Sequence, residues 1–289
     1  MTYGVPVLLI RELAVARTLN NIAVVLLGLA YGILNEGVLA KTLTQPDGAP
    51  LEDFVGYGQI GALEGGWAIF IVFWHSLHSV LYPILLSRWM FPAAADRRWF
   101  ALGRARWLLY ILVVILIGLY SLYFLNPVRS DFGVFLVYLV TTVGLVGVAL
   151  RFCKARGAEP ASPLARPSLK PALLGGCMLL FYVFQFWSPR HIPFALFFAL
   201  SAGIIAFAAA LMARPRWRPL PHLLLFSMGD YLTFSVFSAL LSVVSGRNSL
   251  QAVAVGVIFV AIFLYLIRAV TRHPVGRSVT TGRSPADFS

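Results

Sequence analysis

Four ionisable residues interrupt apolar stretches that are otherwise long enough to cross a membrane. They are Glu36, His75, His78 and Asp230. An ionisable side chain inside a bilayer is costly unless it is paired or hydrated, and such residues by default mark a functional site or a structural bond. We therefore take these four residues as the candidate catalytic set.

Glu36 and His75 are expected to lie at matching depths on two consecutive helices. The helical rise of about 1.5 Å per residue places Glu36 roughly 10 Å and His75 roughly 12 Å from the same membrane face. Two antiparallel neighbours would then bring the carboxylate and the ring into direct or one-water contact. His78, three residues on, shares nearly the same face, so it is expected to bond the same carboxylate or a water beneath it. Asn35 is expected to point away or toward the following loop, because neighbouring helix positions diverge by about 100°.

Asp230 lies near the middle of a later apolar stretch, where no Lys or Arg matches its depth. We expect it to be protonated or bonded to hydroxyls, such as those of Tyr231, Ser227 or a tyrosine of a neighbouring helix. An Asn replacement should then fold. Together with Ser79 and Tyr82, the four candidates are expected to form one polar pocket that opens to the outside.

A carboxylate and a histidine are the minimum set for activating a water molecule, since one takes the proton and the other orients the water or stabilises charge. Two histidines and a carboxylate are also ligand types of Zn²⁺. However, HxxH on one helix is a weaker signal than HExxH, and no further histidine lies inside an apolar stretch. We expect no cofactor. Nucleophile motifs, Gly-rich phosphate loops and Schiff-base lysines are absent from these stretches.

Two neighbouring sequences carry a resemblance to known families. YGILNEGVLAKTL and FWHSLHSVLYPILL resemble a group of uncharacterised bacterial and archaeal polytopic membrane proteins over about the first 90 residues, where Glu36, Lys41, His75, Ser79 and Pro83 align. A more distant likeness is to the CAAX-protease and PrsW-like intramembrane glutamic proteases. It implies that Glu36 is the water-activating base and His75 the partner of the oxyanion.

The sequence departs from both patterns at one residue. Asn35 stands where the first group carries a second glutamate, and the EExxxR or EExxK element of the proteases is not met. The loss of the first acid leaves open an inactive or non-enzymatic member.

The elements that must position these residues are transmembrane helices. The chain is 60% hydrophobic and 12% charged, with a mean hydropathy of +0.84, whereas soluble domains have roughly 25% charged residues. A span needs about 20 apolar residues, and lipid requires it to be helical. We predict an all-α, polytopic helix bundle of about eight spans at 20–43, 67–90, 107–126, 132–152, 172–189, 193–213, 221–245 and 249–271.

The distribution of basic residues predicts the orientation. Of the 23 lysines and arginines, all but Lys41, Arg129, Arg190 and Arg247 fall in alternate connections and at the two ends. Cytoplasmic loops carry the excess of Lys and Arg, so both termini are predicted to be cytoplasmic. The expected location is the inner (cytoplasmic) membrane.

The segments outside the spans complete the predicted organisation. Residues 1–272 form one transmembrane domain, and 273–289 are read as a disordered tail. The segment 3–17 reads as an interfacial helix with Arg11, Glu12 and Arg17 on its polar side. The outer loop 44–66 is either a solvated connection or a lid over a site.

Three functions stay open. The first is an intramembrane hydrolase, which needs Glu36 and His75 near a cavity that a substrate can enter. The second is a proton-coupled small-molecule or ion transporter, which should have a cavity continuing past Asp230. The third is a structural or assembly protein, whose polar groups are satisfied by neighbours. The partner is the lipid bilayer. The short basic tracts between apolar runs argue against nucleic acid, and no protein partner is indicated.

Overall fold

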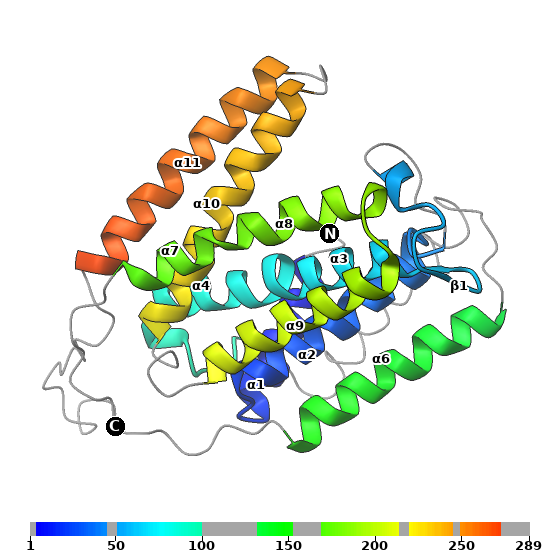
Figure 1. The fold of residues 1–289 in the computed structure, drawn as a ribbon. Coiled ribbons are helices and arrows are strands. Elements are labelled where there is room, and N and C mark those ends of the chain that lie inside the picture. Colours follow the sequence, from blue (N-terminus) through cyan, green and yellow to red (C-terminus); the bar gives the residue numbers. More distant parts are fainter. Residues whose placement is uncertain are drawn as a thin grey trace, which may run out of the picture.

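The computed structural model describes residues 4–44, 51–99, 132–152, 169–213, 220–244 and 249–272. Nearly all of these residues are helical (Figure 1). The longer helices are α1 (Gly4–Ala16), α2 (Asn21–Ile33), α3 (Gly65–Trp74), α4 (Tyr82–Met90), α6 (Phe132–Phe152), α7 (Lys170–Gly176), α8 (Met178–Trp187), α9 (Phe194–Ala213), α10 (Leu220–Val244) and α11 (Ser249–Arg272). Short elements are η1 (Leu34–Leu39), η2 (Leu51–Phe54), η3 (His75–Leu81), η4 (Pro92–Ala94), η6 (Ser188–Arg190), β1 (Gln59–Ile60) and β2 (Leu63–Glu64).

The prediction of an all-α polytopic bundle is confirmed. Within the described residues, seven helical segments are long and apolar enough to cross a membrane: Asn21–Leu39, Gly65–Met90, Phe132–Arg151, Lys170–Arg190, Phe194–Leu211, Leu220–Val243 and Val253–Arg272. They correspond to seven of the eight predicted spans, and the predicted span 107–126 lies outside the described residues. The cytoplasmic placement of both termini stays a prediction.

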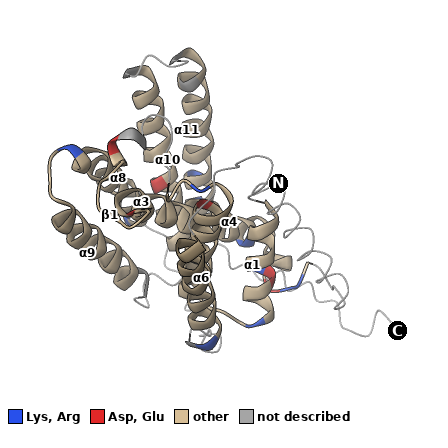
Figure 2. Ribbon diagram, turned by 90° about the vertical axis from the view of Figure 1, so that its right-hand side faces the viewer, with Lys and Arg blue, Asp and Glu red and all other residues tan. Residues whose placement is uncertain are grey.

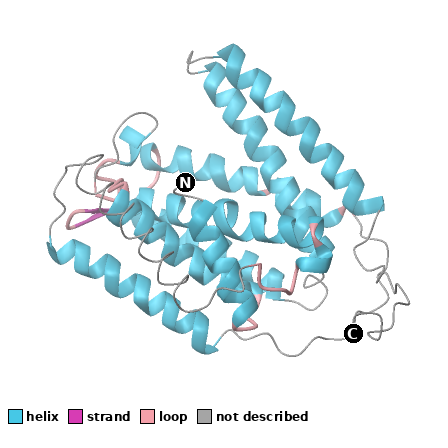
Figure 3. Cartoon of the chain, turned by 180° about the vertical axis from the view of Figure 1, so that it is seen from behind, coloured by secondary structure: helices cyan, strands magenta, loops and turns pink. Residues whose placement is uncertain are grey.

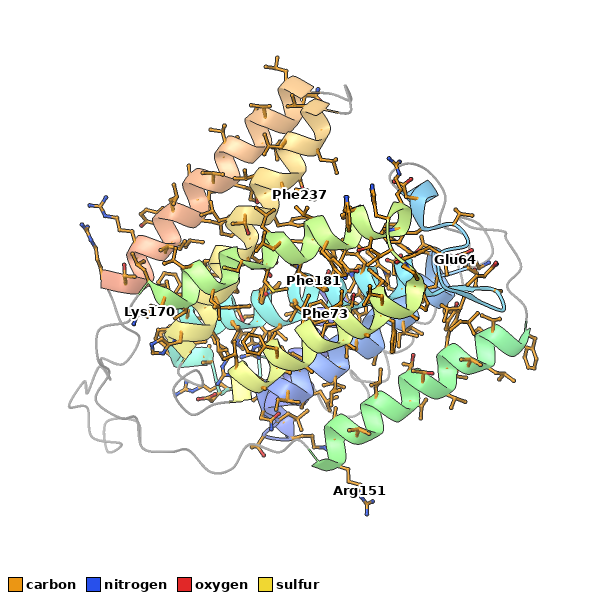
Figure 4. All side chains as sticks on the ribbon, viewed as in Figure 1. Glu64, Phe73, Arg151, Lys170, Phe181 and Phe237 are labelled. Atoms are coloured by element: carbon orange, nitrogen blue, oxygen red, sulfur yellow. The ribbon has the colours of Figure 1, made fainter. Side chains whose placement is uncertain are left out.

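The helices differ in how deeply they are buried. The segments of α2 and of α3–η3–α4 lie centrally and supply a large part of the core, whereas α6, α9 and α11 expose rows of Val, Leu and Phe side chains. Figure 2 shows these three helices free of charge along most of their length. In Figure 4, Phe73 and Phe181 lie inside the bundle, and their rings meet edge to face, with centroids 5.8 Å apart. This arrangement, with exposed apolar helices around a packed centre, is compatible with a lipid environment.

The close packing of α2 against α3 and η3 follows from two glycines in the sequence GLAYG. A Cβ on Gly28 would lie 2.8 Å from the Ser76 Cα, and a Cβ on Gly32 would lie 3.1 Å from the Val72 Cα. Small residues four apart let helix backbones approach closely. The Ser76 hydroxyl then donates across the contact to the Val25 carbonyl at 2.7 Å.

Both helices that meet at this contact contain a π-helical segment. η1 continues α2 and carries Glu36, and η3 continues α3 and carries His75 and His78. A π-helix bonds residue i to i+5, and such segments are rare and frequently lie at functional sites. The α-helical spacing assumed from the sequence therefore fails at the residues of interest.

The N-terminal helix α1 is present as predicted, but its charged residues do not face water. Arg11 and Glu12 are both buried and form an ion pair with each other. Arg11 also donates to the carbonyls of Ala94, Ala95 and Arg97 and lies 3.9 Å from the Trp99 ring centroid, while Glu12 accepts from the Trp99 amide. Arg11 and Glu12 thus anchor α1 to the turn after α4. This turn, rather than water or lipid headgroups, supplies the hydrogen-bond partners of the two charged side chains.

The described part of the predicted outer loop, residues 51–66, is folded rather than loosely solvated. β1 and β2 form a small hairpin, drawn in magenta in Figure 3. Phe54 is fully buried against Trp67 and Phe186, and the Tyr57 hydroxyl donates to the Ile192 carbonyl. Arg190 forms an ion pair with Asp53 at 2.6 Å. The loop caps the ends of α3, α8 and α9.

Candidate functional site

The predicted contact between Glu36 and His75 is present. The His75 Nε2 lies 2.7 Å from the Glu36 Oε1, and both side chains are buried. Gly32, one turn before Glu36, lies against the His75 Cβ, so the absence of a side chain there lets the two helices bring the pair together. The depth argument from the sequence was therefore right for these two residues.

The remaining lone pairs of Glu36 are taken by near neighbours on its own chain segment. Asn35 donates its side-chain amide to Oε1 at 2.7 Å, and the Thr42 hydroxyl donates to Oε2. The Trp67 indole donates in turn to the Thr42 oxygen at 3.1 Å. Asn35 does not point away from the site, which was one of its two predicted orientations, because π-helical winding reduces the divergence between neighbouring side chains and keeps Asn35 beside the carboxylate.

The second ring nitrogen of His75 bonds Ser79. The His75 Nδ1 lies 2.9 Å from the Ser79 Oγ. His75 is thus held at both nitrogens, by a carboxylate on one side and a hydroxyl on the other. When Glu36 is ionised, its carboxylate can only accept, so a neutral His75 ring then donates Nε2–H to Glu36 and accepts from the Ser79 hydroxyl at Nδ1.

Ser79 is half-buried and lines a cavity of about 370 Å³, here called the Ser79 cavity. Its walls come from α1, from α4 and from Trp99. Arg11 lines the same cavity, and its Nε is buried without a hydrogen-bond acceptor. The cavity thus lies beside α1. Of the residues expected to share one polar pocket, Ser79 lines this cavity and Tyr82 lines a different one.

Asp230 and His78 form a separate cluster. Asp230 is fully buried and accepts from the Tyr82 hydroxyl at 2.6 Å and from the Tyr182 hydroxyl at 2.9 Å. His78 Nε2 lies 3.6 Å from the Asp230 Oδ2 and 3.3 Å from the Tyr182 hydroxyl. His78 therefore faces Asp230 and not Glu36, so the expectation that it bonds the Glu36 carboxylate was wrong.

The prediction that hydroxyl groups bond Asp230 was right, but only some of the predicted residues provide them. A tyrosine of a neighbouring helix was expected, and Tyr82 of α4 and Tyr182 of α8 fill that role. Tyr231 instead donates to the His78 carbonyl at 2.5 Å, and Ser227 donates to the Leu224 carbonyl. Asp230 thus ties together three helices that the sequence alone could not bring to one point.

Two glycines hold α7 against α10 at the level of Asp230. A Cβ on Gly175 would overlap the Phe226 carbonyl oxygen, and a Cβ on Gly229 would overlap the Ala172 carbonyl oxygen. Any larger residue would push α7 from α10. The small residues therefore set the position of the helix that carries the buried acid.

The remaining residues of the resembling motif lie around this site. Lys41 is buried and adopts a left-handed backbone conformation with φ of 61°; burial lowers the pKa of its ammonium group below the ordinary value. Pro83 lies in the first turn of α4 and lines the Ser79 cavity. Both residues flank the chain of bonds from Glu36 to Ser79.

The arrangement around the histidines does not resemble a zinc site. In the part of the chain that the structure describes, no three His, Cys, Asp or Glu side chains come close enough together to hold a metal ion. The two histidines diverge, each toward a different carboxylate. The donor set is thus two acid–histidine pairs, which are suited to moving protons.

Three contributors to the site were not among the sequence-predicted set. Thr42 lies at the end of the predicted span 20–43 but was not singled out, Arg11 lies outside the predicted spans, and Ser79 was noted only as a polar neighbour. The i,i+4 spacing of His75 and Ser79 was a usable signal, because such residues share a helix face. No sequence signal placed Arg11 in the same cavity as Ser79.

Comparison with known proteins is consistent with this architecture. No curated protein and no solved structure is significantly similar to the chain. A family model matches residues 1–280, which is almost the whole chain. The chain therefore belongs to an uncharacterized membrane protein family.

Proposed function

We propose that the protein is an intramembrane serine hydrolase that cleaves acyl esters of amphiphilic substrates, with Ser79 as its nucleophile. The observation that carries this proposal is the bond sequence Glu36–His75–Ser79, which ends at a cavity wall. A nucleophile, a base in hydrogen-bond reach of it and a third group that orients the base are the diagnostic parts of such a site.

The reaction uses the proton positions set by these bonds. His75 Nδ1 takes the hydroxyl proton as the Ser79 Oγ forms a bond with the acyl carbon, and the Glu36 carboxylate stabilises the imidazolium. The tetrahedral intermediate then breaks its bond to the alcohol, which leaves with the proton from His75. Water attacks the acyl-serine in the same way, with His75 again accepting and returning the proton. The products are a carboxylic acid and an alcohol.

We assign Arg11 as the group that stabilises the oxyanion, through its positive charge. It lines the Ser79 cavity together with the proposed nucleophile. Because Glu12 already balances the charge of Arg11, the site accepts a neutral ester carbonyl in the ground state. Arg11 then stabilises the negative charge that develops on the carbonyl oxygen in the transition state. The other walls are mainly apolar, which favours a substrate with an alkyl or acyl chain.

Ser79 is preferred over a water activated directly by Glu36 for a geometric reason. Both carboxylate oxygens of Glu36 already accept hydrogen bonds, from Asn35 and His75 on one side and Thr42 on the other. The hydroxyl of Ser79, in contrast, reaches the cavity. The resemblance-based assignment of Glu36 as the water-activating base is therefore replaced by an orienting role.

The test is labelling of the purified protein by a fluorophosphonate probe, which reacts with activated serines as fluoride leaves phosphorus. We expect Ser79 to be labelled and Ser79→Ala to abolish labelling. His75→Gln should slow labelling by about 10²- to 10⁴-fold, since it removes the general base. Hydrolysis of p-nitrophenyl esters with increasing chain length should depend on the same residues.

Ser87 provides the matched control. It lines the same cavity, but its hydroxyl donates to the Ile84 carbonyl, and among the described residues no hydrogen bond joins it to a histidine. Ser87→Ala should label at the wild-type rate. Labelling that survives in Ser79→Ala, or that is lost equally in Ser87→Ala, would refute the assignment. Thermal unfolding of each variant shows whether it is folded.

A proton relay is the second candidate, and one observation favours it. The bonds from Trp67 through Thr42, Glu36 and His75 to Ser79 form a continuous chain along the first two spans. Such acid–histidine chains conduct protons in transporters. Proteoliposomes with a trapped pH dye would report proton movement that Glu36→Gln blocks, and this readout does not depend on fluorophosphonate labelling.

A further inference from the structure

The carboxylate of Glu36 is surrounded by hydrogen-bond donors. Asn35 donates its side-chain amide to Oε1 at 2.7 Å, the Thr42 hydroxyl donates to Oε2, and His75 Nε2 lies 2.7 Å from Oε1. A protonated carboxyl group would bring a further donor into this group of donors. The contacts therefore favour an ionised Glu36, which is the form that orients His75 as a base.

Trp67 sets the direction in which Thr42 donates. The indole Nε1 donates to the Thr42 oxygen at 3.1 Å. An indole nitrogen cannot accept, so the hydrogen of the hydroxyl group must point elsewhere, and the Glu36 Oε2 is the acceptor that it meets. Thr42 is only half-buried, so without the indole its hydroxyl group would rotate more freely. Trp67 thus acts on Glu36 through Thr42.

The predicted outer loop holds both residues in place. Phe54 is fully buried and packs against Trp67, with ring centroids 5.6 Å apart. Glu64, which is labelled in Figure 4, donates its amide to the Leu43 carbonyl at 2.8 Å, and Leu43 directly follows Thr42. The loop therefore contacts the pair of Thr42 and Trp67 twice, once through a ring and once through the backbone.

The same loop is attached to the connection between α8 and α9. Arg190 forms an ion pair with Asp53 at 2.6 Å. Asp53 directly precedes Phe54, so the ion pair holds the residue next to the ring that packs against Trp67. The Arg190 side chain is largely exposed. A change at the surface can therefore loosen the loop without touching the buried carboxylate.

We propose that the predicted outer loop regulates the Ser79 site by positioning Glu36. The loop holds Trp67, and Trp67 directs the Thr42 hydroxyl to the carboxylate. Glu36 then keeps the proton of His75 on Nε2, which leaves Nδ1 to take the proton of the nucleophile. The proposal rests on the proposed hydrolase function, because the reactivity of Ser79 is what the loop changes. Thr42 and Trp67 are positioning residues, since neither is among the described residues that line the Ser79 cavity.

The first experiment measures the rate of fluorophosphonate labelling of Ser79 in the full-length protein at increasing probe concentration. Thr42→Val keeps the shape of the side chain but cannot donate, so the maximal rate should fall about 10- to 100-fold, the effect of one hydrogen bond to a charged group. The probe concentration at half the maximal rate should not change. Thr42→Ser should retain the wild-type rate. An unchanged rate in Thr42→Val, or an equal loss in Thr42→Ser, would overturn the proposal.

A double-mutant cycle tests whether Trp67 acts through Thr42. Trp67→Phe keeps an aromatic ring beside Phe54 but removes the donor, and it should lower the maximal rate about 3- to 10-fold. Combined with Thr42→Val it should cause no further loss, because no hydroxyl group is left to direct. Additive losses would mean that Trp67 acts independently of Thr42, and the proposal would be wrong.

A charge swap tests the loop itself. Asp53→Arg places two cations opposite each other and should lower the maximal rate about 2- to 5-fold, the size expected for an exposed ion pair. Asp53→Arg combined with Arg190→Asp restores the pair and should restore the rate. Val55→Arg adds the same charge at an exposed position of the loop and should have no effect. A swap that fails to restore the rate, or an equal loss in Val55→Arg, would refute control by the loop.

The protonation of His75 can be read without any reaction at Ser79. In ¹⁵N NMR of the protein with labelled histidine, the signals of His75 are those lost in His75→Gln. The wild-type ring should carry its proton on Nε2, and Thr42→Val should raise the fraction of rings protonated at Nδ1. Unchanged protonation in Thr42→Val would overturn the positioning proposal even if Ser79 is labelled. A wild-type Ser79 that is not labelled would refute the hydrolase function, while the NMR result still decides the positioning of His75.

Discussion

Replacing Gly28 by alanine should weaken the contact that positions His75. The added Cβ would lie 2.8 Å from the Ser76 Cα and 3.0 Å from the Ser76 carbonyl oxygen. Carbon atoms pack best at about 3.5–4.0 Å, so α2 and η3 would have to separate by about 1 Å. Backbone atoms cannot rotate away as a flexible side chain can, and the shift must therefore involve the helices themselves.

Three contributions set the size of the effect. Overpacking costs about 1–3 kcal/mol. Separation by this distance also breaks the 2.7 Å bond from Ser76 to the Val25 carbonyl, which contributes about 0.5–1.5 kcal/mol. The higher helix propensity of alanine offsets about 0.8–1 kcal/mol. The net loss in the free energy of unfolding should therefore be about 0.5–4 kcal/mol.

Gly203→Ala is the matched control, because this glycine is also helical but a Cβ there would meet nothing within 4 Å. It should gain up to about 1 kcal/mol from propensity alone. Both variants can be compared by unfolding in mixed detergent micelles, together with the rate of fluorophosphonate labelling at Ser79. If Gly28→Ala stabilises the protein as much as Gly203→Ala, the close approach does not exist and the positioning argument fails.

Three further predictions concern other parts of the molecule. Asp230→Asn should fold but lose about 1–3 kcal/mol, because an amide retains only one of the two acceptors that Tyr82 and Tyr182 use; complete loss of folded protein would mean that the carboxylate is indispensable. Arg11→Lys should lower the unfolding temperature although it keeps the charge, since an ammonium cannot reproduce the planar set of donors, whereas an unchanged temperature would contradict the anchoring of α1. Single cysteines at positions 57 and 162 should be labelled by impermeant reagents from opposite membrane faces, and labelling of both from one face would refute the predicted orientation.

The sequence was sufficient for the helices and for one contact of the site. Long apolar runs predict spans because lipid permits few alternatives, and matching depths on consecutive antiparallel spans predicted the pairing of Glu36 with His75. Both arguments use distance along the helix axis, which the rise per residue determines. Such arguments tolerate an error of one or two residues at a helix end.

The sequence was insufficient where the direction around a helix axis mattered. Asn35 and His78 were both assigned from α-helical angles, but Asn35 does not point away from the site, and the assignment of His78 to Glu36 was wrong. The partners Tyr82, Tyr182 and Asp230 come from three separate helices, so their meeting depends on packing between helices that no local pattern encodes. The burial of Arg11 and Glu12 likewise depends on a turn more than 80 residues away.

The winding of η3 explains how one helix serves two acids. A π-helix has roughly 4.4 residues per turn, so positions three apart diverge by about 115° instead of the roughly 60° of an α-helix. His75 therefore faces Glu36 on α2, while His78 faces Asp230 on α10. The same winding leaves positions four apart only about 30° from alignment, which places Ser79 beneath His75. The wider divergence between His75 and His78 in the π-helix is therefore what separates the two acid–histidine pairs, whereas His75 and Ser79 would share a face in an α-helix as well.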